Sequence, residues 1–154
     1  RDVLEVRKAL EELAVQLACD KITKEEIEEM KKAAEDFKKI LKSKDITEIA
    51  EADVRFHDII YMATDNQKLI QLLNNLREQM LRFRSISMHY PGRLAATWEE
   101  HRQMVENIAD HNSAMARKVA KKHMENSERT LLKGISKDEE SARRVHELFP
   151  HGGE

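Results

Sequence analysis

The chain has 154 residues, 40% hydrophobic and 36% charged, which is enough for one domain with a buried core. Its formal net charge of −2 argues against a segment that binds nucleic acid by itself, because phosphate binding needs a basic face. Cys19 is the single cysteine, so an intrachain disulfide is excluded and a reducing, cytoplasmic setting is expected. No apolar run reaches the length of about 18 residues that crosses a membrane, so we expect no membrane partner.

The sequence predicts an all-α fold. Glycine and proline are absent from residues 1–90 and 93–133, and these stretches are rich in Ala, Leu, Glu, Lys and Met. Apolar residues recur at helical spacing. We therefore expect an antiparallel bundle of six to seven helices, with helices over residues 3–19, 23–42, 45–63, 68–88, 93–110, 113–133 and 136–148.

Capping signals suggest how the chain is divided. Thr23 with Glu26 forms a capping box at the start of the second helix, and Ser136 with Glu139 forms another. Gly134 between them is typical of a helix end. The expected organisation is a bundle over residues 1–133, followed by a short charged helix and tail over 134–154. The helical pattern begins almost at residue 1 without an initiator Met, so we expect a C-terminal piece of a longer protein.

Four ionisable residues fall on the apolar faces of three predicted helices. Asp53 and His57 lie one turn apart on one face, and His101 and His123 each lie within an apolar stripe. The helices that carry His101 and His123 are joined by a short turn, which places the two imidazoles at similar heights. Buried ionisable groups need compensation. The set predicts a site for a divalent transition metal such as Zn, Ni or Mn, either tetrahedral or octahedral with two positions free.

Three further residues are candidates for binding a ligand beside that metal. Arg7 and Arg84 lie at the edges of apolar stripes, where a guanidinium could bind a carboxylate or pair with a neighbouring Glu. Asn126 belongs to a polar strip next to His123, together with Ser127 and Thr130. These residues predict a small carboxylic acid as the ligand.

Four segments between about residues 3 and 130 form a recognisable series: LEVRKALEELAVQLA, EADVRFHDIIYMATDNQKLIQLL, LRFRSISMHYPGRL and EEHRQMVENIADHNSAMARKVAKKHMENS. Together they resemble the FCD domain, the effector-binding C-terminal half of many GntR-type bacterial transcription regulators. Within the four segments, the Asp-x-x-x-His, Glu-His and His-Met pairs follow one another at the family's spacing. The chain departs from the family at Asp110-His111-Asn112, where Gly-Asp is usual, and this change should leave the site intact.

The resemblance implies metal binding by Asp53, His57, His101 and His123, with an organic acid effector above the metal. It also implies a winged helix-turn-helix domain, absent from this chain, through which a homodimer binds DNA. Some family members lack the metal histidines and bind acyl ligands, whereas this chain keeps them all. The sequence therefore favours a sensory domain and no enzymatic activity.

Two alternatives remain open at this point. A metal-dependent hydrolase would need a general base, for which Glu100 is the only obvious candidate, but its helical position is expected to direct it away from His101. A metal-free dimerisation bundle would use the histidines as polar core residues. A second apolar edge at Ile70, Leu81 and Met88 could form a partner surface under any of these hypotheses, including the sensory domain.

Overall fold

The computed structural model describes residues 2–148, apart from the side chains of residues 141, 142 and 144–148. Its elements are α1 (Asp2–Lys21), α2 (Lys24–Ile40), the 3-10 turn η1 (Leu41–Ser43), α3 (Ile46–Ala63), α4 (Gln67–Asn75), α5 (Arg77–Met88), α6 (Arg93–Ala109) and α7 (Ser113–Leu148). The prediction of an all-α bundle is confirmed. The tail predicted over residues 149–154 lies outside the described residues.

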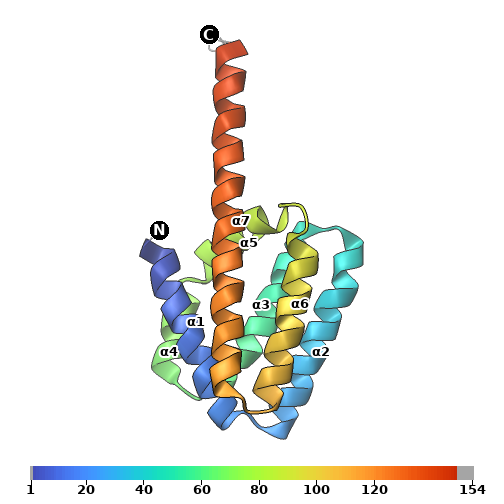
Figure 1. The fold of residues 1–154 in the computed structure, drawn as a ribbon, viewed down its shortest axis with the longest axis vertical. Coiled ribbons are helices and arrows are strands. Elements are labelled where there is room, and N and C mark those ends of the chain that lie inside the picture. Colours follow the sequence, from blue (N-terminus) through green and yellow to red (C-terminus); the bar gives the residue numbers. More distant parts are fainter. Residues whose placement is uncertain (1, 149–154) are drawn as a thin grey trace.

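The long helices stand side by side and alternate in direction (Figure 1). The short turn after α6 makes α6 and α7 antiparallel neighbours, as predicted. Helix α7 also packs against α1 and α5, and α3 packs against α1, α2 and α5. The beginning of α2 matches the predicted capping box, in which Thr23 and Glu26 exchange hydrogen bonds. Helices α1, α3, α6 and α7 therefore enclose a common interior.

One end of that interior is an apolar core. It is built from the C-terminal halves of α1, α3 and α6, the middle of α2 and the first turns of α7, and includes Ala18, Ile60, Met104, Ile108 and Ala116, each at most 1% exposed. Burial of these side chains follows the helical stripes seen in the sequence. A second, smaller cluster between α2, α3 and α5 contains Met88. Met88 is 5% exposed, so it belongs to the core and not to the partner surface suggested for it.

The predicted helix over residues 68–88 is divided into α4 and α5 at Leu76. Neither glycine nor proline marks the junction, so the sequence carries no breaker there. After the break, α5 packs against α3 and α7, whereas α4 packs mainly against α1. Arg77, the first residue of α5, donates two hydrogen bonds to Asp58 of α3. The bend thus turns α5 across the interior of the bundle.

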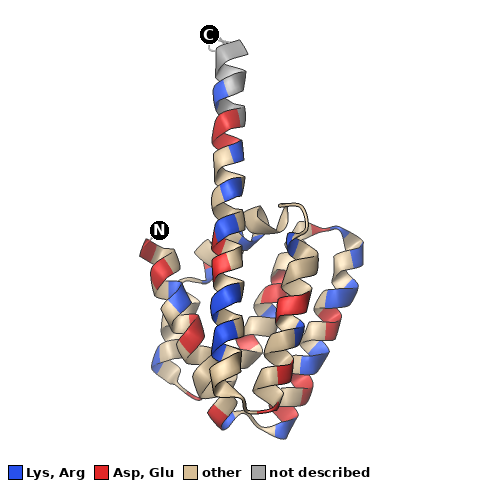
Figure 2. Cartoon of the chain, in the orientation of Figure 1, with Lys and Arg blue, Asp and Glu red and all other residues tan. Residues whose placement is uncertain are grey.

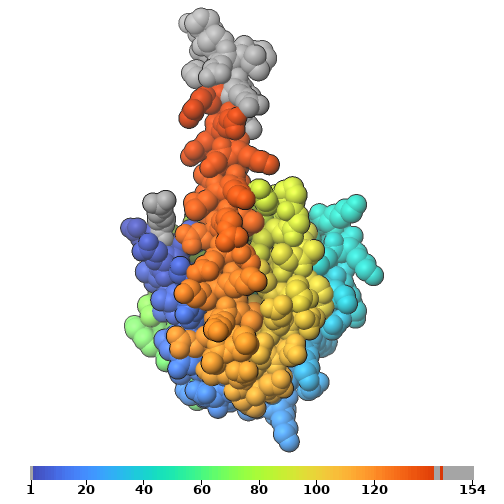
Figure 3. Space-filling view, viewed as in Figure 1, coloured from blue at the N-terminus to red at the C-terminus, as the bar shows by residue number. Residues whose placement is uncertain are grey.

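The helix predicted to end at Gly134 continues to Leu148, so the prediction of a separate helix from Ser136 was wrong. A Cβ at Gly134 would lie 2.8 Å from the Ile86 Cγ2 atom, which indicates that glycine is needed here for close packing against α5. The Ser136 hydroxyl donates to the Leu132 carbonyl of the same helix instead of capping a new one. The last turns of α7 consequently project beyond the bundle, at the end where α1 begins (Figures 1 and 3).

Charged residues of both signs are distributed over the outer faces of the helices (Figure 2). Within residues 2–148, none of the helices has the length and apolar character needed to cross a membrane.

Candidate metal centre

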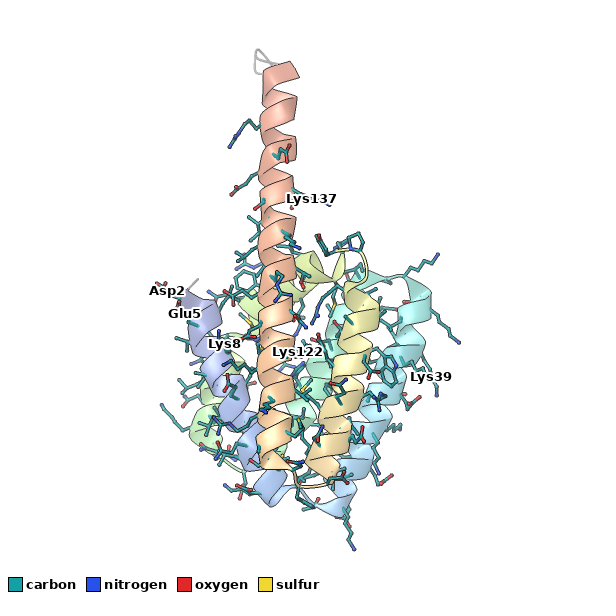
Figure 4. The ribbon with its side chains drawn as sticks, in the orientation of Figure 1. Asp2, Glu5, Lys8, Lys39, Lys122 and Lys137 are labelled. Atoms are coloured by element: carbon teal, nitrogen blue, oxygen red, sulfur yellow. The ribbon has the colours of Figure 1, made fainter. Side chains whose placement is uncertain are left out.

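The structure brings the four predicted ligands together. Asp53, His57, His101 and His123 each offer one ligand atom, and these atoms all lie within 4.8 Å of one another. All four residues are at most 3% exposed. Asp53 and His57 come from the middle of α3, His101 from α6 and His123 from α7. On α7, Lys122 is exposed on the outer face (Figure 4), whereas the neighbouring His123 is buried.

Several of the converging atoms have no hydrogen-bond partner. The Asp53 Oδ1 atom lies 2.9 Å from His101 Nε2 and 3.5 Å from His57 Nε2, but neither contact has hydrogen-bond geometry. These three atoms are fully buried and unpaired among the described residues. Buried polar atoms without partners are unfavourable unless a ligand compensates them. The donor set of one carboxylate and imidazoles suits a divalent transition metal.

The outer nitrogens of two histidines face carboxylates. His57 Nδ1 lies 3.6 Å from Glu11 Oε2, and the other Glu11 oxygen accepts a hydrogen bond from the Tyr61 hydroxyl. His123 Nδ1 donates to Glu100 Oε2. A carboxylate behind a histidine fixes the orientation of the ring and leaves Nε2 as the ligand atom. Glu11 and Glu100 therefore orient two of the three imidazoles inward.

Glu100 was predicted to point away from the site, and that prediction was wrong. Glu100 is 7% exposed, and its carboxylate accepts hydrogen bonds from Arg93, Asn126 and His123. Glu100 lies outside the apolar stripe of α6, so the stripe alone predicted an outward side chain. Polar groups of α7, His123 and Asn126, cover this side of α6 and bury the carboxylate. With each oxygen already bonded twice, Glu100 positions His123 and does not serve as a general base.

The third imidazole lies between aromatic rings. The ring centroid of His101 is 4.1 Å from that of Phe56, in a stacked arrangement, and 4.7 Å from that of Phe37. Its Nδ1 atom is buried without a hydrogen-bond partner among the described residues. Packing of the two phenylalanine rings thus positions His101 without a carboxylate.

Burial and charge set the protonation of the ligands. Burial lowers the pKa of His101 to about 4, and it also lowers the pKa of His123 despite the neighbouring Glu100. For His57, burial is outweighed by the charges of Asp53 and Glu11, which raise the pKa. Burial would raise the pKa of Asp53, but Arg84 and His57 hold it well below its usual range. Asp53 is therefore ionised, and two of the imidazoles are neutral, as metal ligands must be.

Two of the three predicted ligand-binding residues lie beside the cluster. Arg84 is 8% exposed and forms an ion pair with Asp53. Arg7 is 6% exposed, and its Nε atom lies 3.4 Å from Glu11 Oε1, the neighbouring-Glu pairing considered from the sequence. Asn126 lies further out, and its amide donates to Glu100 Oε1 at 2.7 Å.

A narrow pocket reaches the cluster. Its cavity is small, with a volume of about 30 Å³. Asp53, His123, Arg7, Arg84 and Arg93 contribute to its wall. A ligand in this pocket would contact both metal ligands and guanidinium groups.

Sequence reasoning missed Arg93, Glu11 and Tyr61. Arg93 donates two hydrogen bonds to Glu100, at 3.0 and 2.8 Å, and a third to Ser127 at 2.8 Å. Helical spacing carried a signal for two of these residues, because Arg93 precedes Glu100 by seven positions and Arg7 precedes Glu11 by four, so each pair shares a face. Tyr61 likewise follows His57 by four positions, but its hydrogen-bond partner Glu11 lies on another helix.

Comparison with known proteins gives the family. The family model described as the FCD domain matches residues 2–126. One curated relative, the uncharacterized HTH-type transcriptional regulator YdhC of Bacillus subtilis (strain 168), is 28% identical over 126 residues. That match covers 80% of this chain and 54% of the relative, so the chain spans about half of the relative's length. The chain therefore belongs to the FCD domain family.

Proposed function

We propose that this chain is the ligand-sensing and dimerisation domain of a GntR-type transcription regulator. In this proposal Asp53, His57, His101 and His123 bind one divalent transition metal, and a small organic acid binds next to it. The domain works in the cytoplasm as a homodimer and changes DNA binding by an attached winged-helix domain. Membership of the FCD family and the regulator relative support the general role.

The main support for a metal site is a group of buried atoms that lie close together and lack hydrogen-bond partners among the described residues. These atoms are Asp53 Oδ1, His57 Nε2 and His101 Nε2. A stable protein retains such a cluster when a ligand compensates it. The metal would supply a positively charged centre at which a carboxylate could bind.

Other residues of the site orient the metal ligands and line the pocket. Glu11 and Glu100 orient His57 and His123, and the rings of Phe37 and Phe56 position His101. Arg84 neutralises Asp53 and also lines the pocket. Because the wall of the pocket is formed by α1, α3, α5, α6 and α7, a bound acid would contact most of the bundle. A ligand that prefers one packing of these helices would shift the population of that packing.

Native mass spectrometry and thermal melting test the proposal. Protein purified without added metal should carry one metal ion per chain, and the assembly should have the mass of a dimer. Saturation at 1,000 times the dissociation constant stabilises by about 4 kcal/mol, so chelation should lower the melting temperature by about 10 °C. A small carboxylate should raise the melting temperature only when metal is present.

The two alternatives predict different results. Equal melting with and without chelator, together with no bound metal, would favour the metal-free dimerisation bundle. Hydrolysis of an ester or amide that is lost in His101→Ala would revive a metal-dependent hydrolase. The bonding of Glu100 to three neighbours and its pKa of about 2, lowered by His123 and Arg93 against the effect of burial, disfavour that role.

A further inference from the structure

The buried charges of the site fall into three pairs of opposite sign. Arg7 pairs with Glu11, Arg84 with Asp53 and Arg93 with Glu100. All six residues are less than 9% exposed. The protein's own formal charge around the site is therefore zero once each carboxylate is matched with its guanidinium.

The rim of the site does not alter this balance. Lys8 and Glu128 line the mouth of the pocket and have opposite charges. Asp58 and Arg77 line a neighbouring pocket that Arg84 also lines, and they form an ion pair of their own at 2.6 Å. The groups around the pocket thus contribute no net charge.

A divalent cation bound by neutral imidazoles and Asp53 would leave this buried region with a charge of +2. Unbalanced charge is expensive in a buried environment of low dielectric constant. A monocarboxylate would cancel half of the excess and a dianion all of it. We propose that the site is built for a short dicarboxylate in preference to any monocarboxylate, an inference that rests on the proposed metal site.

The lining of the pocket provides partners for two anionic groups. One carboxylate would bind where Asp53 and His123 converge on the metal. The second would face the guanidinium side of the same pocket, which Arg7 and Arg84 line. The Nε atoms of these arginines face Glu11 and Asp53, so the terminal nitrogens of the guanidinium groups would be the donors to this carboxylate. Arginine recognises carboxylates well because its donors match their planar geometry. The narrow inner space favours a short connecting chain.

Isothermal titration calorimetry of the metal-loaded chain tests the proposal with acids matched in length. Malonate is compared with propionate and succinate with butyrate, at constant pH and ionic strength, and native mass spectrometry verifies that the metal stays bound. We expect at least one dicarboxylate to bind about 10-fold or more tightly than its matched monocarboxylate. Metal-free protein should show a much weaker preference, because the charge of +2 that the ion supplies is absent.

A pair of variants tests the role of charge directly. Ser127 lines the pocket and accepts a hydrogen bond from Arg93. Ser127→Asp adds one negative charge at the wall and should reduce the preference for dicarboxylates about 3-fold or more. Ser127→Asn, similar in size but uncharged, should retain the preference. If the Asp variant does not fold, the comparison of matched acids on the unmodified chain tests the dicarboxylate inference by itself.

The outcomes separate this inference from the proposed function. Equal, metal-dependent binding of matched acids would overturn the dicarboxylate inference and leave the proposed function standing. Failure of every acid to bind metal-loaded protein would overturn both. Tighter binding of phosphate or sulfate than of each dicarboxylate would overturn the organic ligand while keeping the argument from charge.

Discussion

The two ends of the bundle interior are equally buried but chemically opposite. At one end, the C-terminal parts of α1, α3 and α6 pack apolar side chains such as Ile60 and Ile108, both 0% exposed. At the other end, histidines, carboxylates and arginines are enclosed to nearly the same degree. The apolar end is satisfied by its own contacts, whereas several polar atoms at the other end have no partner within the described residues. Burial alone therefore does not distinguish a structural core from a binding site, but unmet hydrogen-bonding capacity does.

The largest effect should come from the apolar end. Ile108→Ala removes a fully buried side chain from the core, and such truncations cost about 2–5 kcal/mol of unfolding free energy. The loss should be the same with and without metal, because the site is not touched. Chemical denaturation in the presence of metal and in the presence of chelator measures both values. A loss confined to the metal-loaded protein would show that the two ends are coupled.

A smaller effect, restricted to metal binding, should come from Glu100→Gln. The substitution keeps the shape of the side chain but weakens its bonds to His123 and Arg93, and loss of such a supporting group reduces metal affinity roughly 10- to 100-fold. Competition titration with a chromogenic chelator measures the affinity. Glu99→Gln is the matched control, because Glu99 is the exposed neighbour that pairs with Arg102. Equal effects of the two substitutions would contradict the assigned role.

The smallest effect should be a gain in stability in metal-free protein. His101→Leu removes two buried nitrogens that lack hydrogen-bond partners among the described residues, and relief of that penalty should stabilise the metal-free chain by about 1 kcal/mol. The same substitution should abolish stabilisation by metal. Urea denaturation with and without metal gives both results. A less stable metal-free variant would indicate that His101 is a structural core residue.

The same variant also isolates a pH dependence. The pKa of His101 is lowered by burial to about 4 in the folded chain, against 6.5 for an ordinary histidine. Between these values the unfolded chain binds more protons, so this residue makes folding less stable as the pH falls from 6.5 toward 4. Metal-free wild-type protein should therefore lose more stability between pH 7 and pH 5.5 than His101→Leu does. His89→Leu, at an exposed position outside the cluster, is the matched histidine control.

Periodicity predicted the fold and the inward direction of the four metal-binding candidates, because each of these properties follows from helical geometry. It could not predict the division of the helix at Leu76, where packing rather than a glycine or proline bends the chain. Gly134 was misread as a helix end because local sequence does not show that Ile86 lies against it. The inward turn of Glu100 was missed because its partners, His123 and Asn126, come from another helix. Sequence patterns within one helix predict which way its side chains face. The residues that support the metal-binding candidates, such as Glu100, are fixed by contacts between helices, which such patterns do not show.

Helix α7 connects the metal-binding candidates to the end of the helix that projects beyond the bundle. It carries His123 inside the bundle and continues without interruption to Leu148, outside it. At 1.5 Å of rise per residue these positions are about 37 Å apart, so a 5° tilt of a straight helix pivoting near His123 would displace its tip by about 3 Å. The projecting helix thus amplifies motion. A tilt too small to disturb the packing around the His123 imidazole displaces the far end of α7 by about the diameter of an atom.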